Sequence, residues 1–453
     1  FTGLEKSIFK VYKIYQTKIR ELNACDFGDL ILYCVKLFEN NPDIKKIYNN
    51  NFKYILVDEF QDTNFIQNKW LNLLVSENQN ICCVGDDDQS IYSWRGAEIK
   101  NFLTFDSIYK NCKIFKLEQN YRSTKNILET ASTLISHNKG RVEKKLWSSA
   151  QQGEKVKLNC YQTGREEAEA ISDIAEKKLK KKYSLNDVAI LVRAIYQTRE
   201  FEERFLKVGL GYRVLGGTKF YERAEVKDAV AYLRIINQKY DDLALERVIG
   251  SPRRGIGEST LNQLYNFASQ NKLCLEDSIK KKLETENLKP KIKTSLIQLT
   301  KMIDKWRLDS NKNKHYDLLK IVLDESGYSE MLKNKKDIEN ENRLENIKEL
   351  LRAMHDYDNL QAFLEHVALA TSIDKEWEGD KINLMTMHGA KGLEFDVVFL
   401  PGWEEGLFPH QKSLEEKGDL ALEEERRLAY VGVTRAKKEA YLSFAMKRSY
   451  HGE

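Results

Sequence analysis

Residues 55–62 read ILVDEFQD, an apolar run that leads into two adjacent acids. A short apolar run followed by a helix-like stretch, here FIQNKWLNLLV, is typical of a buried strand in an α/β domain. A second such run, NICCVGDDD, comes after that helix, and strand–helix–strand alternation favours a parallel sheet. Because ligands bind at the carboxyl ends of parallel strands, Asp58 and Glu59 are predicted to lie at a binding edge.

Asp58 and Glu59 have the chemistry that nucleotide hydrolysis requires. One carboxylate holds Mg²⁺, directly or through its water shell, and the other orients and activates the attacking water. Two acids at a strand end are nevertheless more often simply solvated, since a motif of this length is common by chance. The dipeptide alone therefore does not decide the function.

The second strand run continues as VGDDDQSIYSWRG at residues 84–96. Three consecutive acids repel one another, and a Trp is an unusual residue for a simple surface loop. The arrangement suits a loop beside a magnesium-bound nucleotide, in which Gln89 senses the terminal phosphate. Tyr92 and Trp94 are then available to a second ligand.

Five segments resemble motifs II to VI of the UvrD/Rep/PcrA group of superfamily 1 DNA helicases. In chain order they are VDEFQDTN (57–64), VGDDDQSIYSWRGA (84–97), LEQNYRS (117–123), MTMHGAKGLEFDVVFL (385–400) and EEERRLAYVGVTRAKK (423–438). Two more, YRVLGGTKFYERAEVKD (212–228) and SPRRGIGEST (251–260), are similar to further parts of the family. One match could arise by chance, whereas an ordered set that covers nearly the whole chain does not.

The resemblance implies ATP and Mg²⁺ as cofactors. The catalytic set that it implies is Asp58, Glu59, Gln89, Arg122 and Arg435, with Asp58 and Glu59 at the metal. Arg122 and Arg435 are implied to reach the γ-phosphate, for which a planar, permanently charged guanidinium has a fitting geometry. An arginine in this role can raise a phosphoryl-transfer rate by about 10³–10⁵. Tyr121 is implied to stack on adenine and Glu394 to contact the ribose.

The resemblance also implies binding to single-stranded DNA and to duplex junctions. Tyr92 and Trp94 match residues that stack on bases, with Arg95 beside them, and each stacked base contributes about 1–3 kcal/mol. His388 matches a residue that lies near DNA and couples it to the nucleotide site. Without the motif context, a Trp is more often part of a core and a lone His part of a polar network.

The segment SPRRGIGEST resembles the turn with which the family contacts duplex DNA. Gly255 and Gly257 flank Ile256, and this spacing lets backbone N–H groups at a helix start approach a phosphate. Arg253 and Arg254 add positive charge beside them. The alternative interpretation is an ordinary glycine-containing turn between two helices.

Strand-like and helix-like stretches divide the chain into sections. A third strand is expected at residues 112–120 (CKIFKLEQN). Further strands are expected between 155 and 216 and again after 381. The expected strand sequences in these two sections are KVKLNCYQ, DVAILVR, YRVLGG, KINLMTMHGAKG, DVVFLPG and EAYLSFA.

The expected fold class is α/β, with two RecA-like P-loop NTPase-type domains and mainly helical insertions. Residues 1–52 are predicted to be the remnant of a helical insertion in the first domain, and 53–118 the C-terminal part of that incomplete domain. Residues 119–217 and 381–453 are predicted to form the second RecA-like domain. The intervening residues 218–380 are predicted to form a helical insertion that contacts duplex DNA.

No P-loop of the pattern G-x-x-x-x-G-K-[ST] occurs in the sequence, which contains no Gly-Lys dipeptide. Backbone N–H groups of that loop hold the phosphates, and its Lys reaches the β- and γ-oxygens. In the family this loop precedes motif II, and residue 1 here is Phe, so we expect an N-terminally truncated helicase motor. On that hypothesis the chain alone is inactive towards ATP, and its first sheet has an exposed edge.

The amino-acid composition excludes some classes of protein. Among 453 residues, 73 Lys plus Arg against 69 Asp plus Glu give a net charge of +4, which excludes a polybasic tail protein but not a nucleic-acid binder. Seven Cys without a CxxC pair indicate a reduced, intracellular protein without a zinc site. No apolar run is long enough to span a bilayer. The expected location is the cytoplasm, and the resemblance to DNA helicases implies association with the nucleoid.

The prediction is therefore an ATP-dependent 3′–5′ DNA helicase that unwinds duplex DNA. Its expected pathways are repair or replication restart, and accessory proteins of those pathways are its expected protein partners, with no membrane partner. A non-catalytic DNA-binding remnant is one alternative, although degraded catalytic residues would be expected of it and all five are present. One part of a split helicase, or of a helicase–nuclease, is another.

Overall fold

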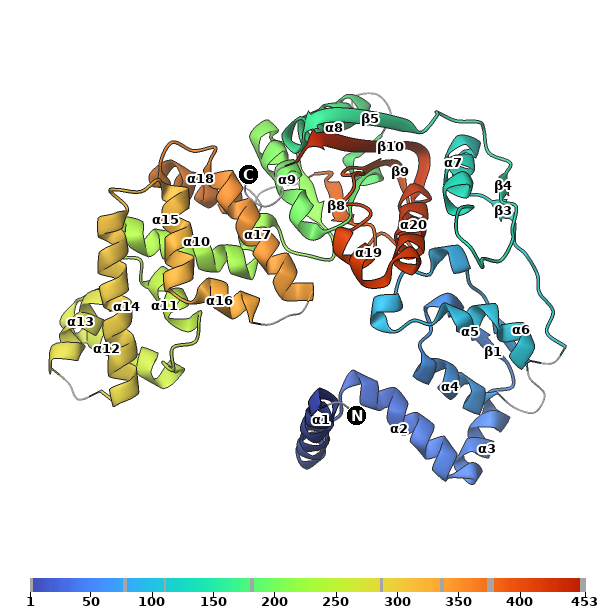
Figure 1. The fold of residues 1–453 in the computed structure, drawn as a ribbon, viewed down its shortest axis with the longest axis horizontal. Helices are drawn as coiled ribbons and strands as arrows, with labels where there is room; N and C mark the ends of the chain where they lie inside the picture. Colours follow the sequence, from blue (N-terminus) through green and yellow to red (C-terminus); the bar gives the residue numbers. More distant parts are fainter. Residues whose placement is uncertain are drawn as a thin grey trace. The chain divides into compact units, whose positions relative to one another are not determined.

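The computed structural model describes residues 3–75, 80–109, 111–179, 183–285, 288–334, 338–372 and 379–448. The chain folds into two compact units, whose elements are labelled in Figure 1. Unit 1 consists of Phe1–Val156 and Glu405–Glu439, and unit 2 of Lys157–Glu404 and Ala440–Glu453. None of the described helices is both long and apolar enough to cross a membrane.

Unit 1 begins with the helices α1 (Gly3–Glu21), α2 (Phe27–Asn40) and α3 (Pro42–Asn51). A capping box starts α2: the carboxylates of Asp26 and Asp29 each accept the backbone N–H of the other residue. This pairing satisfies N–H groups that have no partner inside the helix. The helices predicted for the first 50 residues are confirmed.

The first sheet of unit 1 has two strands, β1 (Ile55–Val57) and β2 (Ile81–Cys83), which pair in parallel. The helix α4 (Phe65–Leu74) connects them in the chain. Each strand has one neighbour within the described residues, so both outer edges of this sheet are unpaired there. Leu56 in the middle of β1 is 80% exposed.

The strand predicted for residues 112–120 is almost entirely absent, so this prediction was wrong. Only Gln119–Asn120 (β3) pairs, in parallel with Trp147–Ser148 (β4). The side chains of Ile114 and Phe115 are mostly exposed. An extended segment needs a neighbouring strand for its backbone hydrogen bonds, and the described residues provide none for the rest of this segment.

The remaining helices of unit 1 come from two separate stretches of the chain. They are α5 (Ile99–Leu103), α6 (Phe105–Ile108), α7 (Lys125–Ile135), α19 (Gln411–Lys417) and α20 (Asp419–Val433). The helix α20 packs against α7 and against the turn that follows β2. The end of α20 therefore lies beside the acids that were predicted to serve a nucleotide.

Unit 2 contains a six-stranded sheet with the order β5-β10-β9-β6-β8-β7. Its strands are β5 (Lys157–Thr163), β6 (Val188–Val192), β7 (Tyr212–Val214), β8 (Ile382–Thr386), β9 (Phe395–Leu400) and β10 (Ala436–Lys447). The pairings β5–β10, β9–β6, β6–β8 and β8–β7 are parallel.

The centre of this sheet is covered on both faces. All five residues of β6 are buried, as parallel strands between two helical layers usually are. The helices α8 (Gly164–Leu179) and α9 (Thr198–Val208) follow β5 and β6 in the chain. Each strand predicted between 155 and 216 and after 381 is present, and the α/β fold class is confirmed.

Between β7 and β8 the described residues are helical. The helices are α10 (Ala224–Asn237), α11 (Asp242–Gly250), α12 (Glu258–Asn271), α13 (Leu275–Thr285), α14 (Pro290–Asp309), α15 (His315–Glu325), α16 (Tyr328–Lys333), α17 (Ile338–Met354) and α18 (Leu360–Ser372). Their core is built around Tyr232, whose ring meets those of Trp306 and Tyr328 edge to face. This helical part has its own hydrophobic core.

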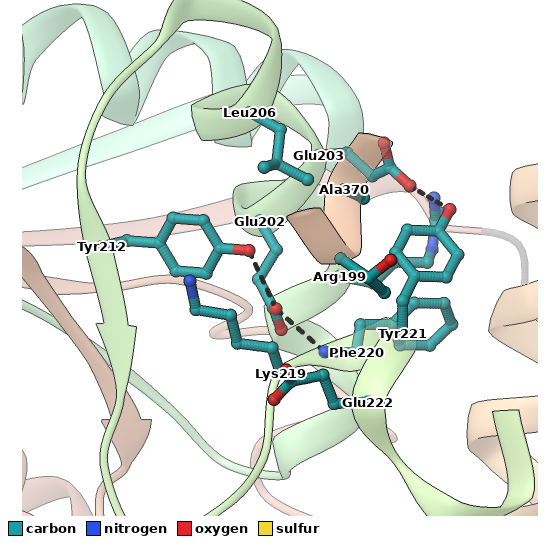
Figure 2. Close-up of a pocket in the computed structure, with 11 residues that line it drawn as sticks. Arg199, Glu202, Glu203, Leu206, Tyr212, Lys219, Phe220, Tyr221, Glu222 and Ala370 are labelled. Carbon is teal, nitrogen blue, oxygen red and sulfur yellow. Dashed lines mark hydrogen bonds between the residues drawn. The ribbon is translucent and has the colours of Figure 1, made fainter. Parts of the chain in front are cut away.

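A buried carboxylate joins the helical part to the sheet of unit 2 (Figure 2). Glu202 of α9 accepts hydrogen bonds from Tyr212 Oη on β7 (3.4 Å) and from the backbone N–H of Phe220 (2.9 Å). Arg223, which precedes α10, donates to Glu202 from Nη2 (3.2 Å). Burial raises the pKa of Glu202, and the charge of Arg223 opposes that shift. The ion pair thus fixes the start of the helical part to the sheet.

Glu202→Ala is expected to lower the free energy of unfolding by about 3–5 kcal/mol, because it leaves the buried Arg223 charge without its partner. Urea unfolding followed by circular dichroism measures the change. Glu284→Ala, at an exposed position of α13, is the matched control and should stay within about 0.5 kcal/mol of the parent. Equal stability of the two variants would contradict the role given to Glu202.

Candidate functional site

Gln61 joins the two strand ends of unit 1. Its Nε2 donates to Glu59 Oε2 (2.5 Å), and its Oε1 accepts the backbone N–H of Asp86 (3.0 Å). The Gln61 side chain is fully buried, and a Cβ at Gly85 would lie only 2.4 Å from Gln61 Oε1. The absence of a side chain at Gly85 therefore allows the acids that follow β1 and β2 to be held side by side.

The end of β1 presents two carboxylates from an unusual backbone conformation. Glu59 lies in the left-handed region (φ 50°, ψ 41°), which few residues other than glycine adopt. Asp58 Oδ1 accepts the backbone N–H of Glu59 (2.9 Å), and both residues are exposed. Such backbone conformations are often found at ligand sites, and exposed carboxylate oxygens are the ligands that Mg²⁺ prefers.

The turn that follows β2 holds Gln89 against Asp86. Asp86 Oδ1 accepts the N–H of Asp88 (3.1 Å), and Asp86 Oδ2 accepts a hydrogen bond from Gln89 Nε2 (2.7 Å). Asp87 and Asp88 are buried, whereas Asp86 is partly exposed. Of the three adjacent acids noted in the sequence, two thus serve the interior of unit 1.

Arg435 lies against this turn, directly after the end of α20. Its side chain is 1% exposed, Nε donates to Val431 O (3.0 Å), and Nη2 lies 3.5 Å from Gln89 Oε1. Burial lowers the pKa of Arg435 to about 10; the positive charge of Arg122 acts in the same direction, and Glu59 opposes it. The charges of Arg122 and Glu59 thus lie within electrostatic reach of Arg435.

Arg122 is positioned by the residues on either side of it. Asn120 Oδ1 accepts the backbone N–H groups of Arg122 (3.1 Å) and Ser123 (2.9 Å). Ser123 Oγ donates to the carbonyl of Ala436 (2.6 Å), the residue that follows Arg435. The two predicted phosphate arginines are therefore anchored at a common point, and two neighbouring guanidinium groups suit an anion such as a phosphate.

Two domain families match this chain. The UvrD/REP helicase N-terminal domain matches residues 2–110, and the UvrD-like helicase C-terminal domain matches residues 115–447. The chain belongs to the UvrD-like helicase family. The resemblance to the UvrD/Rep/PcrA group that the motifs predicted is thereby confirmed.

Named relatives of this UvrD-like helicase are similar over nearly all of its sequence. A probable DNA helicase II homolog of Rickettsia felis is 46% identical, over 97% of this chain and 67% of its own length. The ATP-dependent DNA helicase PcrA of Bacillus subtilis is 41% identical, over 99% of this chain and 62% of its own length. The chain thus spans about two thirds of the length of the first relative and somewhat less of the second.

The aromatic loop of this UvrD-like helicase, residues 92–95, is bonded to α20; Tyr92 is partly buried and the other three residues are exposed. Trp94 is 52% exposed, and the Arg95 guanidinium lies 4.7 Å from its ring centroid and 5.1 Å from that of Tyr92. The backbone N–H of Ser93 donates to Glu424 Oε1 of α20 (3.2 Å), and its hydroxyl donates to the other carboxylate oxygen. The loop is therefore attached to the same helix that ends at the buried arginine.

The residue predicted to stack on adenine and the residue predicted to contact the ribose belong to different units. Tyr121 in unit 1 is 79% exposed, and its hydroxyl donates to Gln119 Oε1 (2.7 Å), so its ring is accessible beside Arg122. Glu394 and His388 belong to unit 2, in the segment between β8 and β9. Glu394 is exposed and His388 is partly buried.

The glycine turn in the helical part of this UvrD-like helicase has one exposed and one internal arginine. Gly255 has a positive φ (74°), and Gly257 is the N-cap residue of α12. Arg254 donates to Pro252 O (2.9 Å), to Tyr232 Oη (2.8 Å) and to a further backbone carbonyl. Its donors thus brace the turn, whereas Arg253 is exposed.

Gly85→Ala tests the link between the strand ends. The added Cβ would displace Gln61, and we expect the variant to lose about 1–3 kcal/mol of stability, as is typical when atoms are forced into a packed site. Thermal unfolding measures this loss. Gly250→Ala, where nothing lies within 4 Å of the added Cβ, is the control and should melt like the parent. An unchanged melting temperature for Gly85→Ala would contradict the close approach.

Proposed function

We propose that this UvrD-like helicase is an ATP-dependent translocase that unwinds duplex DNA in the 3′ to 5′ direction, in DNA repair or replication restart. The observation that carries the proposal is a set of hydrogen bonds in unit 1. They link Glu59 through Gln61 to the turn after β2, and Gln89 of that turn to Arg435. Ser123, which follows Arg122, bonds to the residue that follows Arg435. The relatives named as DNA helicases, one of them as an ATP-dependent DNA helicase, support it. Accessory proteins of those pathways are its proposed protein partners.

The residues of the site fit Mg²⁺ and ATP. The exposed carboxylates of Asp58 and Glu59 supply the oxygen ligands that Mg²⁺ prefers, bound directly or through water. The guanidinium groups of Arg122 and Arg435 fit phosphate oxygens. A bound nucleotide supplies the phosphoanhydride bond whose hydrolysis releases the energy for movement.

Each residue of the site has a separate chemical task in this proposal. Glu59 orients the attacking water and accepts its proton. Arg122 and Arg435 stabilise the negative charge that develops on the terminal phosphate, an effect that burial strengthens because the local dielectric is low. Gln89 responds to that phosphate through Arg435. The exposed ring of Tyr121 is proposed to stack on adenine, and Glu394 is proposed to contact the ribose.

The link between nucleotide and DNA is proposed to run along α20. Tyr92 and Trp94 stack on the bases of a single strand, with the positive charge of Arg95 beside them. Any displacement of α20 caused at its end by phosphate is transmitted to this loop through Glu424 and Ser93. Hydrolysis would then change the grip on the strand, because the two states bind DNA differently.

The duplex is proposed to contact the helical part, predicted at residues 218–380. Gly255 and Gly257 present backbone N–H groups at the start of α12, and Arg253 adds an exposed charge. Arg254 supports the turn from inside, so its contribution to DNA binding is proposed to be indirect. His388 is proposed to lie near the single strand.

The sequence of this chain contains no P-loop, so we infer that the chain alone binds and hydrolyses ATP weakly. Activity is therefore tested in the full gene product that carries this chain. DNA-stimulated ATP hydrolysis and unwinding of a duplex with a 3′ single-stranded tail are the expected results. Absence of ATP hydrolysis with and without DNA would favour the alternative of a non-catalytic DNA-binding protein.

Glu59→Gln in that protein should reduce the rate of ATP hydrolysis by at least about 10², the usual contribution of a general base. Binding of a fluorescent ATP analogue should persist, because the amide keeps the size and polarity of the side chain. Rapid-quench kinetics measures the first quantity and fluorescence titration the second. Normal hydrolysis by the variant would remove Glu59 from the role of base.

Trp94→Ala should weaken binding to single-stranded DNA by about 1–3 kcal/mol, the loss of one stacked base. Fluorescence anisotropy with a labelled oligonucleotide measures the affinity. Trp147→Ala, which removes a tryptophan of similar exposure from β4, is the matched control. Equal affinities of the two variants for the oligonucleotide would contradict the proposal that Trp94 stacks on a base.

A further inference from the structure

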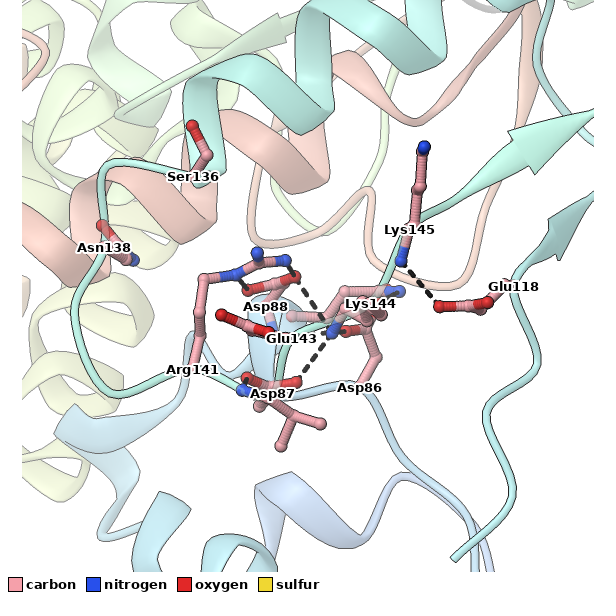
Figure 3. Close-up of polar contacts among 12 residues, drawn as sticks. Asp86, Asp87, Asp88, Glu118, Ser136, Asn138, Arg141, Glu143, Lys144 and Lys145 are labelled. Atoms are coloured by element: carbon pink, nitrogen blue, oxygen red, sulfur yellow. Dashed lines mark hydrogen bonds and ion pairs between the residues drawn. The ribbon is translucent and has the colours of Figure 1, made fainter.

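A short basic segment crosses the acidic turn of unit 1 (Figure 3). This segment, here called the basic strap, comprises residues 139–145 (KGRVEKK) between α7 and β4. It lies against the acidic turn, residues 86–88, which directly precede Gln89. None of the family motifs quoted above includes the strap.

The strap neutralises the acidic turn through specific contacts. Arg141 grips both oxygens of the Asp88 carboxylate, with Nε 3.0 Å from Oδ1. The backbone N–H of Val142 donates to Asp87 Oδ2 (2.9 Å). Lys144 Nζ lies 2.7 Å from Asp87 Oδ1 and 2.9 Å from Asp88 Oδ2, and it also pairs with Asp86. One ammonium group is thus shared by three carboxylates.

Burial makes these contacts necessary for the shape of the turn. Asp88 is 1% exposed, and an unpaired buried carboxylate would be strongly unfavourable. Burial also disfavours the charge of Lys144, but the carboxylates of Asp86, Asp88 and Asp87 outweigh it and raise the pKa of Lys144. Lys144 therefore stays charged throughout the neutral range.

The ammonium group of Lys144 also bears on the metal. The three carboxylates of the acidic turn lie close enough together to hold a cation, but Lys144 already bonds to all three of them. A Mg²⁺ ion there would have to displace it. The metal role therefore stays with Asp58 and Glu59.

A chain of contacts leads from the strap to the proposed phosphate site. Lys144 binds Asp86 through Oδ1, while Asp86 Oδ2 holds the Gln89 amide (2.7 Å). The other end of that amide faces Arg435 Nη2 (3.5 Å). The start of the strap is fixed to α20, since the backbone N–H of Lys139 donates to Glu423 Oε1 (2.8 Å). The strap therefore contacts both elements that carry the site, the acidic turn and α20.

We propose that Lys144 and Arg141 are positioning residues for nucleotide hydrolysis: they hold the acidic turn so that Gln89 faces Arg435. This inference rests on the proposed ATPase function. Neither residue needs to touch the nucleotide. Lys144 acts by fixing Asp86, and through it the direction of the Gln89 amide. Arg141 acts one step further away: it holds Asp88, whose backbone N–H donates to Asp86 Oδ1.

A double-mutant cycle in the full gene product tests this inference. Lys144→Met should lower kcat of DNA-stimulated ATP hydrolysis about tenfold with little change in KM, since contacting residues commonly couple at this level. In a Gln89→Ala background the same substitution should change kcat less than about twofold, because its target is already absent. Lys145→Met, whose side chain lies away from the acidic turn (Figure 3), should behave like the parent.

The possible results distinguish failure of the proposed ATPase function from failure of the positioning role. An inactive parent protein would count against the proposed function itself. If the parent is active and Lys144→Met leaves kcat unchanged, the positioning role is overturned. An equal loss of kcat in the parent and in the Gln89→Ala background would also overturn it, because such a loss indicates a general structural effect. If Lys144→Met fails to fold, Arg141→Lys takes its place in the same double-mutant cycle. This substitution keeps the positive charge but removes the bidentate hydrogen bonding to Asp88, and kcat should fall about threefold.

Discussion

A guanidinium group can be buried only if its surroundings are arranged around its charge. Arg435 is almost completely buried at the end of α20, and the site of unit 1 is organised around it. The backbone carbonyl of Val431 in α20 accepts its Nε donor, Gln89 faces one of its nitrogens, and Glu59 lies within electrostatic reach. Arg122 adds a second positive charge whose repulsion a bound phosphate would relieve. Two positive charges held near each other suit the proposed role of sensing the terminal phosphate of a nucleotide.

In the proposed function, the helix α20 gives the phosphate sensor a mechanical output. Its end leads to Arg435, its middle bonds to the aromatic loop through Glu424, and Glu423 bonds to the basic strap. A helix is a stiff element, so a displacement at one of these points reaches the others. The proposed coupling between ATP and DNA therefore needs no long pathway of small changes. It needs one helix with a phosphate contact at its end and a DNA contact along its side.

Buried ion pairs recur in both units where one element must be fixed to another. In unit 1, Lys144 and Arg141 compensate the acidic turn, and in unit 2, Arg223 compensates Glu202. Removing one partner of such a pair costs more than the pair contributes, because a charge remains in a low-dielectric surrounding. These pairs accordingly define geometry more than they add stability.

The sequence by itself determined the α/β fold, the helices of the first 50 residues, the strands of unit 2 and the family, because these depend on local periodicity and on motif strings. It failed for residues 112–120, where an apolar pattern has no neighbouring strand within the described residues. It also did not single out Gln61, Asn120, Ser123 or the basic strap, although three of these residues lie inside quoted motifs. Only the tertiary structure decided that Ser123 meets Ala436, that Lys144 meets Asp86, and that Arg254 points inward. The physical reason is that a local pattern states which groups are polar, whereas the folded chain decides which buried charges and hydrogen-bonding groups become partners.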